Sequence, residues 1–274
     1  MNIFTILHPI LTFFTRLDVN YRGKNFITRN LLLKLNIDKE KIIKTNGSYF
    51  KLKLNDFVDK YIYITGEYES DVKSLLKKEL KRGDTFLDIG ANIGFYSILA
   101  SKIVGTNGKV IACEASPKMV PRLKTNISLN NISNIEIIEK AISNESGQVK
   151  FYISDNLNSG MSSLRELNNV EPVIVNSIKL DDYCDKLPKI KLIKIDIEGA
   201  EHNAIKGMRK LINRDKPIII LEVIDLFLNQ FGSSSNELLQ ELDFLGYDFF
   251  DMNGEKLNST DEIKEQMNVL FKTR

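Results

Sequence analysis

Two acidic residues stand at the ends of short apolar runs, where a strand of a parallel sheet would end. Asp88 lies inside the run 85–89, which leads directly into the turn GANIG, and Glu114 follows the run 109–113. Glycines at such a turn permit a positive φ and let a ligand approach the backbone closely. Open α/β sheets bind ligands at the carboxyl ends of their strands. An acid placed like Glu114 typically accepts hydrogen bonds from ribose hydroxyls, so the pattern predicts a nucleoside cofactor over the turn.

The charge of Asp88 distinguishes between two nucleoside cofactors. The pyrophosphate of NAD is anionic and prefers N–H donors at a helix start, and a carboxylate just before the turn would repel it. S-adenosylmethionine instead carries a sulfonium and an ammonium, which Asp88 attracts through complementary charge. The turn also lacks the middle glycine of the GxGxxG pattern. We therefore expect S-adenosylmethionine rather than NAD. A strand–turn–helix corner without a ligand is the structural alternative.

Three further carboxylates follow the later apolar runs. Asp196 and Glu198 come after the run 190–195, and Glu222 lies within the run 217–223. Adjacent parallel strands would bring them to one rim, where unpaired charge beside a buried apolar run is costly. One of them could be the general base that removes the proton of an acceptor hydroxyl, or together they could hold a divalent cation. We favour a substrate or base role for Asp196 or Glu198 over a metal site. In the structural alternative the acids cap helices or pair with cations, namely Lys194, Lys206 or Arg209.

His202 and Glu201 follow this group within a predicted helix. Histidine titrates near neutral pH and can act as a base. A lone histidine on a helix is more often structural, so His202 is the weaker catalytic candidate. For Glu201 we expect a structural role, in which its negative charge stabilises the N-terminus of the helix through the helix dipole.

Alternating strands and helices must position these residues. Short apolar runs separated by helical stretches indicate a doubly wound, mostly parallel sheet. Near-continuous apolar runs are typical of strands covered on both faces. The predicted strands are 85–89, 109–113, 135–139, 190–195 and 217–223, with helices at 96–104, 117–130 and 204–213 between them. A further helix is expected at 237–245, followed by a closing antiparallel pair at 248–252 and 268–272.

Two hairpins are expected outside this alternation. Residues 147–153 and 173–175 enclose a polar stretch, which predicts an inserted hairpin or added strand pair. Nearer the N-terminus, 49–54 alternates between apolar and polar residues and 61–64 follows after a turn, which predicts a second hairpin. We therefore divide the chain into an N-terminal arm with a β-hairpin, residues 1–66, and the main domain, residues 67–274.

Composition excludes several other classes of protein. The chain has 274 residues, 43% of them hydrophobic, which is enough to bury a core. Since 38 Lys and Arg offset 36 Asp and Glu and no basic block stands out, no nucleic-acid partner is expected. Cys113 and Cys184 form no metal-binding pattern, so a zinc site is not expected and reduced thiols of a cytoplasmic protein are the simple interpretation.

An apolar run at residues 3–14 raises the question of a membrane. It is shorter than the roughly 20 apolar residues that span a bilayer, and no Lys or Arg precedes it as in a secretory signal. We expect a helix packed on the domain or a contact in a homodimer, with weak surface attachment as the minority interpretation. The expected location is the cytoplasm, with peripheral membrane attachment as the alternative.

Two motifs of this chain resemble those of a known enzyme family. The segments TFLDIGANIGFYSIL at 85–99 and KIDIEGAE at 194–201 together resemble FkbM-type methyltransferases, which belong to the class I S-adenosylmethionine-dependent enzymes. The resemblance covers residues 67–225. It implies a Rossmann-like, seven-stranded sheet with helices on both faces. It also implies methyl transfer, commonly to oxygen on sugars, glycolipids or polyketide-type products, and it does not fix the acceptor.

The resemblance implies roles for individual positions. The cofactor would be bound by Asp88, Gly90, Asn92, Gly94, Glu114, Ala115, Ser116, Lys140, Ala141 and Asp196. Within this set the glycine turn would meet the methionine end, Glu114 the ribose, and Ser116 and Ala141 the adenine. The catalytic candidates are Asp196, Glu198 and His202, and the substrate candidates are Glu222 and Glu69. No metal site is assigned, although a divalent cation remains open.

The expected reaction is therefore transfer of a methyl group to an acceptor hydroxyl, on a sugar, glycan or other small natural product. The sulfonium is already a strong electrophile, so the protein supplies approach geometry, water exclusion and a base. Two other classes stay open. An NAD-dependent oxidoreductase is disfavoured by Asp88 and the missing glycine, and a non-catalytic cofactor-binding scaffold is disfavoured by the intact set of acids and glycines.

Overall fold

The computed structural model describes residues 39–154, 162–164, 166–167, 170–263 and 267–274. Two compact units make up the chain, and the main division between them falls between Ser70 and Asp71. The sequence prediction placed this boundary between residues 66 and 67. The apolar run at residues 3–14, with its predicted packing or dimer contact, lies outside the described residues.

In the first unit, the described residues 39–70 form a hairpin followed by a helix. Strand β1 (Glu40–Thr45) pairs antiparallel with β2 (Ser48–Lys53). The turn between them is Asn46-Gly47, and both residues have a positive φ, 49° and 72°. Asn-Gly is the preferred pair for a two-residue hairpin turn because both positions must adopt this conformation. This local signal identifies the hairpin.

The predicted partner strand at 61–64 is wrong, because these residues form part of helix α3 (Phe57–Thr65). Asp56 caps the helix: its side chain accepts a hydrogen bond from the backbone N–H of Asp59 at 3.2 Å. Gly66, in the left-handed conformation, ends it and donates to the carbonyl of Ile62. Caps of this kind satisfy the free backbone groups at helix ends and outweigh the strand preference of aromatic and β-branched residues.

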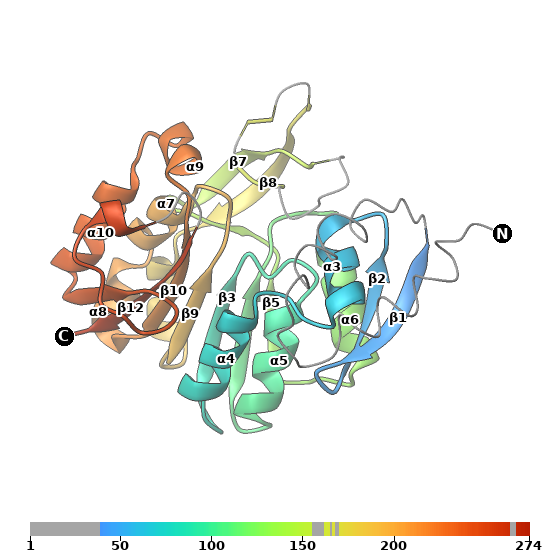
Figure 1. The fold of residues 1–274 in the computed structure, drawn as a ribbon. Coiled ribbons are helices and arrows are strands. Elements are labelled where there is room, and N and C mark those ends of the chain that lie inside the picture. Colours follow the sequence, from blue (N-terminus) through green and yellow to red (C-terminus); the bar gives the residue numbers. More distant parts are fainter. Residues whose placement is uncertain (1–38, 155–161, 165, 168–169, 264–266) are drawn as a thin grey trace. The chain divides into compact units, whose positions relative to one another are not determined.

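The second unit is built on a seven-stranded sheet, which confirms the predicted fold class (Figure 1). The strands, in their order across the sheet, are β11 (Tyr247–Phe250), β12 (Met267–Thr273), β10 (Ile218–Val223), β9 (Leu192–Ile195), β3 (Thr85–Ile89), β4 (Lys109–Cys113) and β5 (Ile135–Ile138). The five strands from β10 to β5 are parallel. Strand β12 runs antiparallel to both β10 and β11, as the predicted closing pair requires.

Helices connect these strands and cover both faces of the sheet. Their bounds are α4 (Ser70–Glu79), α5 (Phe95–Val104), α6 (Val120–Leu129), α7 (Glu201–Lys206), α8 (Arg209–Asp215), α9 (Asp225–Gln230) and α10 (Ser235–Phe244), with short 3-10 helices at Leu180–Lys186 and Thr260–Glu262. The predicted single helix at 204–213 is two helices that divide at Gly207. A side chain at Gly207 would place its Cβ 1.9 Å from the carbonyl oxygen of Ser143, so the close backbone approach requires glycine.

Strand side chains alternate between the two faces, which separates the core from the polar residues of the sheet. Leu87, Ile111 and Ile193 join the large core that also includes residues of α7, α8 and α10. Their neighbours along the strands point to the opposite face, where Ala112 packs with Leu123 of α6. Asp88 and Lys194 belong to that second face, because they pair in register with each other and with Ala112.

A second, three-stranded sheet is inserted between β5 and β9. Strand β8 (Val173–Ile178) pairs antiparallel with β7 (Gly147–Phe151) and parallel with the short β6 (Ala141–Ile142). The predicted inserted hairpin is confirmed, and β6 extends it by one strand.

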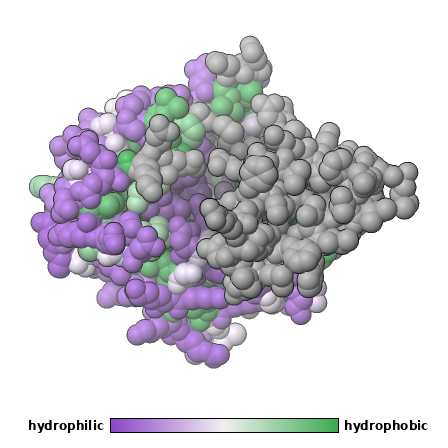
Figure 2. All heavy atoms as spheres, in the orientation of Figure 1, coloured by the Kyte–Doolittle hydropathy of each residue, from purple (hydrophilic) through white to green (hydrophobic). Residues whose placement is uncertain are grey.

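Among the described residues, no helix is both long and apolar enough to cross a membrane. In the face shown in Figure 2, the surface of the C-terminal part is mostly hydrophilic, with hydrophobic residues scattered among polar ones. Scattered apolar residues of this kind are normal on protein surfaces.

Candidate functional site

The carboxyl ends of three parallel strands meet at one point of the sheet. The chain leaves β3 for β4 on one side and reaches β9 on the other, which makes this a topological switch point, where ligands bind in open α/β sheets. The backbone joins the three ends directly. The N–H of Asp196 donates to the carbonyl of Ile89 at 3.0 Å, and that of Gly90 donates to the carbonyl of Cys113 at 3.0 Å.

The glycine turn has the conformation that its sequence predicts. Gly90 and Gly94 both have φ of 86°, and Asn92 has φ of 50°. A Cβ at Gly90 would lie 1.9 Å from the carbonyl oxygen of Asp196, and one at Gly94 would lie 2.5 Å from the Leu123 side chain. Both glycines are therefore needed for close packing against the protein itself. This contact also places the turn directly against Asp196.

Asp88 is almost completely buried at the end of β3, with 1% of its surface exposed. Its Oδ2 accepts a hydrogen bond from the hydroxyl of Ser97, on α5, at 2.5 Å. Burial raises the pKa of Asp88, while the nearby ammonium of Lys194 and the bond from Ser97 act in the opposite direction. The other oxygen, Oδ1, is buried and has no hydrogen-bond partner within the described structure.

Glu114 is held by the backbone at the end of β4. Its Oε2 accepts from the N–H of Asn92 at 2.7 Å, and its Oε1 accepts from the N–H of Ser116 at 2.8 Å. Burial raises the pKa of Glu114 to about 7, although these bonds favour the charged form. Because a carboxylate has about four lone-pair sites in all, Glu114 can still accept a further hydrogen bond.

Three buried polar atoms around the turn have no partner in the part of the chain that is described: Asp88 Oδ1, Asn92 Oδ1 and Ser116 Oγ. Buried polar groups are normally hydrogen-bonded, so such atoms at one edge call for a ligand. Two of the three are pure acceptors and the third is a hydroxyl. This set fits a ligand that brings N–H and O–H donors, such as an ammonium and ribose hydroxyls, better than one that brings phosphate oxygens.

The remaining predicted cofactor residues lie beyond β4 and β5. Ala115 follows Glu114 and is half-buried. Lys140, also half-buried, precedes Ala141, which is buried at the start of β6. Their contact with a cofactor stays a prediction.

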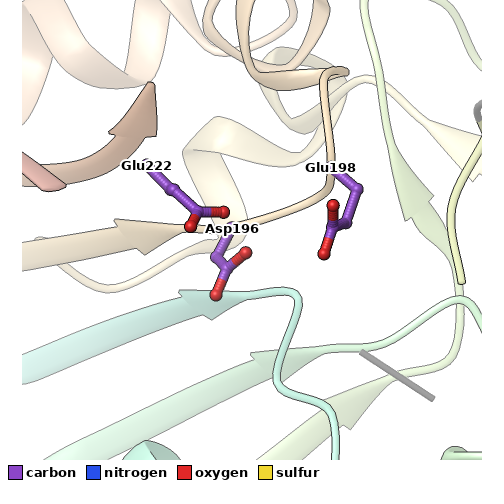
Figure 3. A group of neighbouring side chains, drawn as sticks. All are labelled: Asp196, Glu198 and Glu222. Atoms are coloured by element: carbon purple, nitrogen blue, oxygen red, sulfur yellow. The ribbon is translucent and has the colours of Figure 1, made fainter. Parts of the chain in front are cut away.

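The carboxylates predicted to share a rim do come together. One oxygen each of Asp196, Glu198 and Glu222 lies within 4.8 Å of the others. Figure 3 shows the three side chains pointing toward one another, from the segment after β9 and from β10. All three are half-buried. The spacing would allow a cation to bind, and it equally allows the acids to share protons with one another.

Asp196 forms an ion pair with Lys194, which the sequence analysis named only as a structural partner of the acids. The ammonium of Lys194 lies 2.8 Å from Asp196 Oδ2, and its side chain is 3% exposed. Burial on its own would raise the pKa of Asp196, but the charge of Lys194 and hydrogen bonds with Lys194 and Glu222 outweigh it and lower the pKa. A hydrogen bond between two carboxyl groups requires a proton on one of them.

Glu198 reaches the group through an unusual backbone. It has φ of 57°, and Gly199 after it has φ of 109°. Glu201 supports this loop, since its Oε1 accepts from the N–H groups of Ile197 at 3.0 Å and Gly199 at 3.1 Å. Burial raises the pKa of Glu201 to about 7. Its role here is structural, as expected.

His202 does not belong to the group of Asp196, Glu198 and Glu222. It is buried in α7, and its Nδ1 is hydrogen-bonded to the hydroxyl of Ser233, which precedes α10. Burial lowers the pKa of His202 and Lys206 lowers it further, while Glu241 acts in the opposite direction. These contacts favour the structural interpretation of His202.

Glu69 belongs to the first unit, whereas the carboxylates belong to the second. It has φ of 40° and acts on Tyr61, whose pKa is raised by burial and then by Glu67 and Glu69. Its assignment to the substrate stays a prediction.

Several known proteins are similar to this chain. Residues 88–249 match the Methyltransferase FkbM domain. A probable cobalt-precorrin-6B C(15)-methyltransferase (decarboxylating) from Sulfolobus acidocaldarius is 35% identical over 157 residues, which are 57% of this chain and 74% of the relative. Hexuronic acid methyltransferase AglP from Haloferax volcanii is 27% identical over 154 residues, 56% of this chain and 61% of AglP. The solved structure of Methyltransferase FkbM from Methylobacillus flagellatus KT has a TM-score of 0.45 and 15% identity, and the match covers 79% of this chain and 53% of that one.

The sheet order and the polar strand ends define a Rossmann-like methyltransferase fold. The domain match extends over more than half of the chain and contains the glycine turn, the carboxylates and β10. The protein belongs to the FkbM methyltransferase family.

Proposed function

We propose that this protein transfers the methyl group of S-adenosylmethionine to a hydroxyl of a sugar, glycan or other small natural product. The observation that supports the proposal is that two groups of acidic side chains lie at the ends of neighbouring strands. Asp88 Oδ1 is an open acceptor for a cationic nucleoside and Glu114 would be another, while the backbone of Asp196, whose carboxylate lies near those of Glu198 and Glu222, packs against the turn at Gly90.

The cofactor residues follow from the hydrogen bonds that remain open. Glu114 is fixed by two backbone N–H groups and would accept from the ribose hydroxyls. Asp88 Oδ1 and Asn92 Oδ1 would accept from the ammonium of the methionine end, because both are buried without a hydrogen-bond partner among the described residues. When bound, S-adenosylmethionine supplies an electrophilic methyl group; the protein needs to orient the acceptor and exclude water.

The carboxylates would provide the proton acceptor. Asp196 stays ionised through Lys194, and Glu222 is hydrogen-bonded to it. An acceptor hydroxyl placed at this rim can lose its proton to Asp196 or Glu198 as the new bond forms. Such proton removal is needed for a neutral hydroxyl, which is a weak nucleophile.

The two curated relatives support methyl transfer and leave the acceptor atom open. One is named for a carbon of a precorrin, and the other for a hexuronic acid. We favour oxygen because the clustered carboxylates suit the removal of a proton from a hydroxyl group.

The test is to incubate the protein with S-adenosylmethionine labelled in its methyl group and with fractionated glycans and small molecules of a cell extract. We expect label in a glycan or small-molecule fraction, in a bond stable to mild base as expected of an ether. Label on carbon would contradict the oxygen assignment. Binding of the cofactor without any transfer would favour the scaffold alternative, and binding of NADH in its place would favour the oxidoreductase.

A further inference from the structure

Lys194 is a buried cation that lies close to two acids of the site, Asp88 and Asp196. Its ammonium contacts Asp196 Oδ2 at 2.8 Å and lies 5.1 Å from the centre of the Tyr96 ring on α5. The side chain is 3% exposed, so the charge is buried. Burying an ammonium is costly unless partners compensate it, and here a carboxylate and an aromatic face do so.

The same ammonium acts on the cofactor side of the site. Lys194 on β9 pairs in register with Asp88 on β3, and its charge opposes the effect of burial on that acid. The turn that begins at Gly90 touches the backbone of Asp196. The buried ammonium of Lys194 therefore acts on two acids: Asp88 in the predicted cofactor site and Asp196 in the carboxylate group.

The net charge around Asp88 and Asp196 affects the binding of a sulfonium and the binding of a thioether differently. Carboxylates attract the cationic cofactor, but the positive charge disappears from sulfur as the methyl group leaves. An interaction that is stronger with the bound cofactor than with the transition state slows the reaction. A cation that neutralises one of these carboxylates limits this unwanted stabilisation.

We propose that Lys194 is a positioning residue that fixes the carboxylate of Asp196 and sets the charge where the cofactor and acceptor edges meet. It thereby limits the preference of the site for the cationic cofactor over its neutral product. This inference rests on the proposed function, because it assumes that S-adenosylmethionine binds over the glycine turn.

The experiment compares two ligands that differ in charge at the transfer centre. S-adenosylhomocysteine has a neutral thioether, and sinefungin carries an amine where the sulfonium methyl stands. Calorimetry at pH 8 gives the ratio of their dissociation constants for the wild-type protein, Lys194→Met and Lys194→Arg. We expect Lys194→Met to shift the ratio toward sinefungin by at least about fivefold, because a negative charge loses its partner. Lys194→Arg keeps the charge and should keep the ratio within about twofold.

Asp196→Asn provides a second test if Lys194→Met fails to fold. Its amide oxygen can still accept from the ammonium, while the negative charge is gone. We expect the ratio to shift toward S-adenosylhomocysteine by about threefold. Equal weakening of both ligands in Lys194→Met, or an unchanged ratio in Asp196→Asn, would overturn the inference. Failure of the wild-type protein to bind either ligand would instead contradict the proposed function.

Discussion

Glu114, the acid that follows β4, is held by the backbone, whereas Asp196, which follows β9, is held by other side chains. Both oxygens of Glu114 accept from main-chain N–H groups, which fixes the carboxylate in one orientation. Asp196 instead bonds to Lys194 and Glu222. Backbone donors suit the recognition of a constant ligand, and side-chain partners can exchange protons. This difference supports the proposal that the acids at the ends of β3 and β4 (the recognition edge) bind the cofactor, and that the acids after β9 and on β10 (the chemical edge) take part in the reaction.

Replacing Asp196 by Asn tests the chemical edge and should have the largest effect. Without the carboxylate, the acceptor loses a base, and we expect turnover to fall by about 100-fold. The affinity for S-adenosylmethionine should stay within about fivefold, because the recognition edge is intact. Label transfer in a single turnover measures the first quantity and calorimetry the second.

Glu136→Gln is a suitable control for that variant. Glu136 lies on β5 in an exposed ion pair with Lys109, 2.6 Å apart, and its loss should leave turnover unchanged. Normal turnover in Asp196→Asn would remove this residue from the role of base.

Replacing Glu114 by Ala tests the recognition edge. Two backbone N–H groups and the ribose lose their acceptor, and we expect cofactor affinity to fall at least about tenfold, or ~1.4 kcal/mol. Asp88→Asn should weaken binding by a similar factor, because the charge complementary to the cationic cofactor is lost. Unchanged calorimetric affinity in both variants would refute the assignment of this edge.

Stability should respond to pH through the acids of raised pKa. Burial raises the pKa of Glu114 and of Glu201 from 4.5 to about 7. As the pH rises, the unfolded chain releases these protons at a lower pH than the folded protein does. The stability that they contribute is therefore complete below pH 4.5 and is lost as the pH rises through 7. Denaturant titrations at pH 5, 6, 7 and 8 measure this slope, which should be reduced in Glu114→Gln. A slope equal to that of the wild-type protein would show that Glu114 is already ionised in the folded state.

Removal of divalent cations should have the smallest effect. The buried ammonium of Lys194 already compensates the charge of Asp196, so we expect the group of Asp196, Glu198 and Glu222 to work without a cation. Turnover in excess EDTA should equal turnover before treatment. Loss of activity that magnesium restores would assign a metal to this group in place of the base.

Most of the second unit could be predicted because each signal is local. The apolar runs predicted the strands β3, β4 and β10, and the glycine turn and Glu114 follow from the ends of two of them. The rim of Asp196, Glu198 and Glu222 followed from placing β9 beside β10. Because parallel strands end at the same edge of the sheet, the residues at their carboxyl ends can be expected to lie close together once the strands are known.

Other features depend on contacts that sequence spacing does not contain. The role of Ser97 as the donor to Asp88 requires the exact rotation of α5. The division of the predicted helix at Gly207 depends on the approach of Ser143, 64 residues earlier in the sequence. The first hairpin was misassigned although Asn46-Gly47 carried the signal, because the aromatic and β-branched residues of α3 resemble a strand.

The central claim is that acids at the ends of β3 and β4 bind a cationic sulfur nucleoside. Calorimetric titration of the wild-type protein with S-adenosylmethionine, and separately with NAD, tests it most directly. We predict binding of one S-adenosylmethionine per chain and no heat of binding with NAD. Binding of NAD without binding of S-adenosylmethionine would contradict the account.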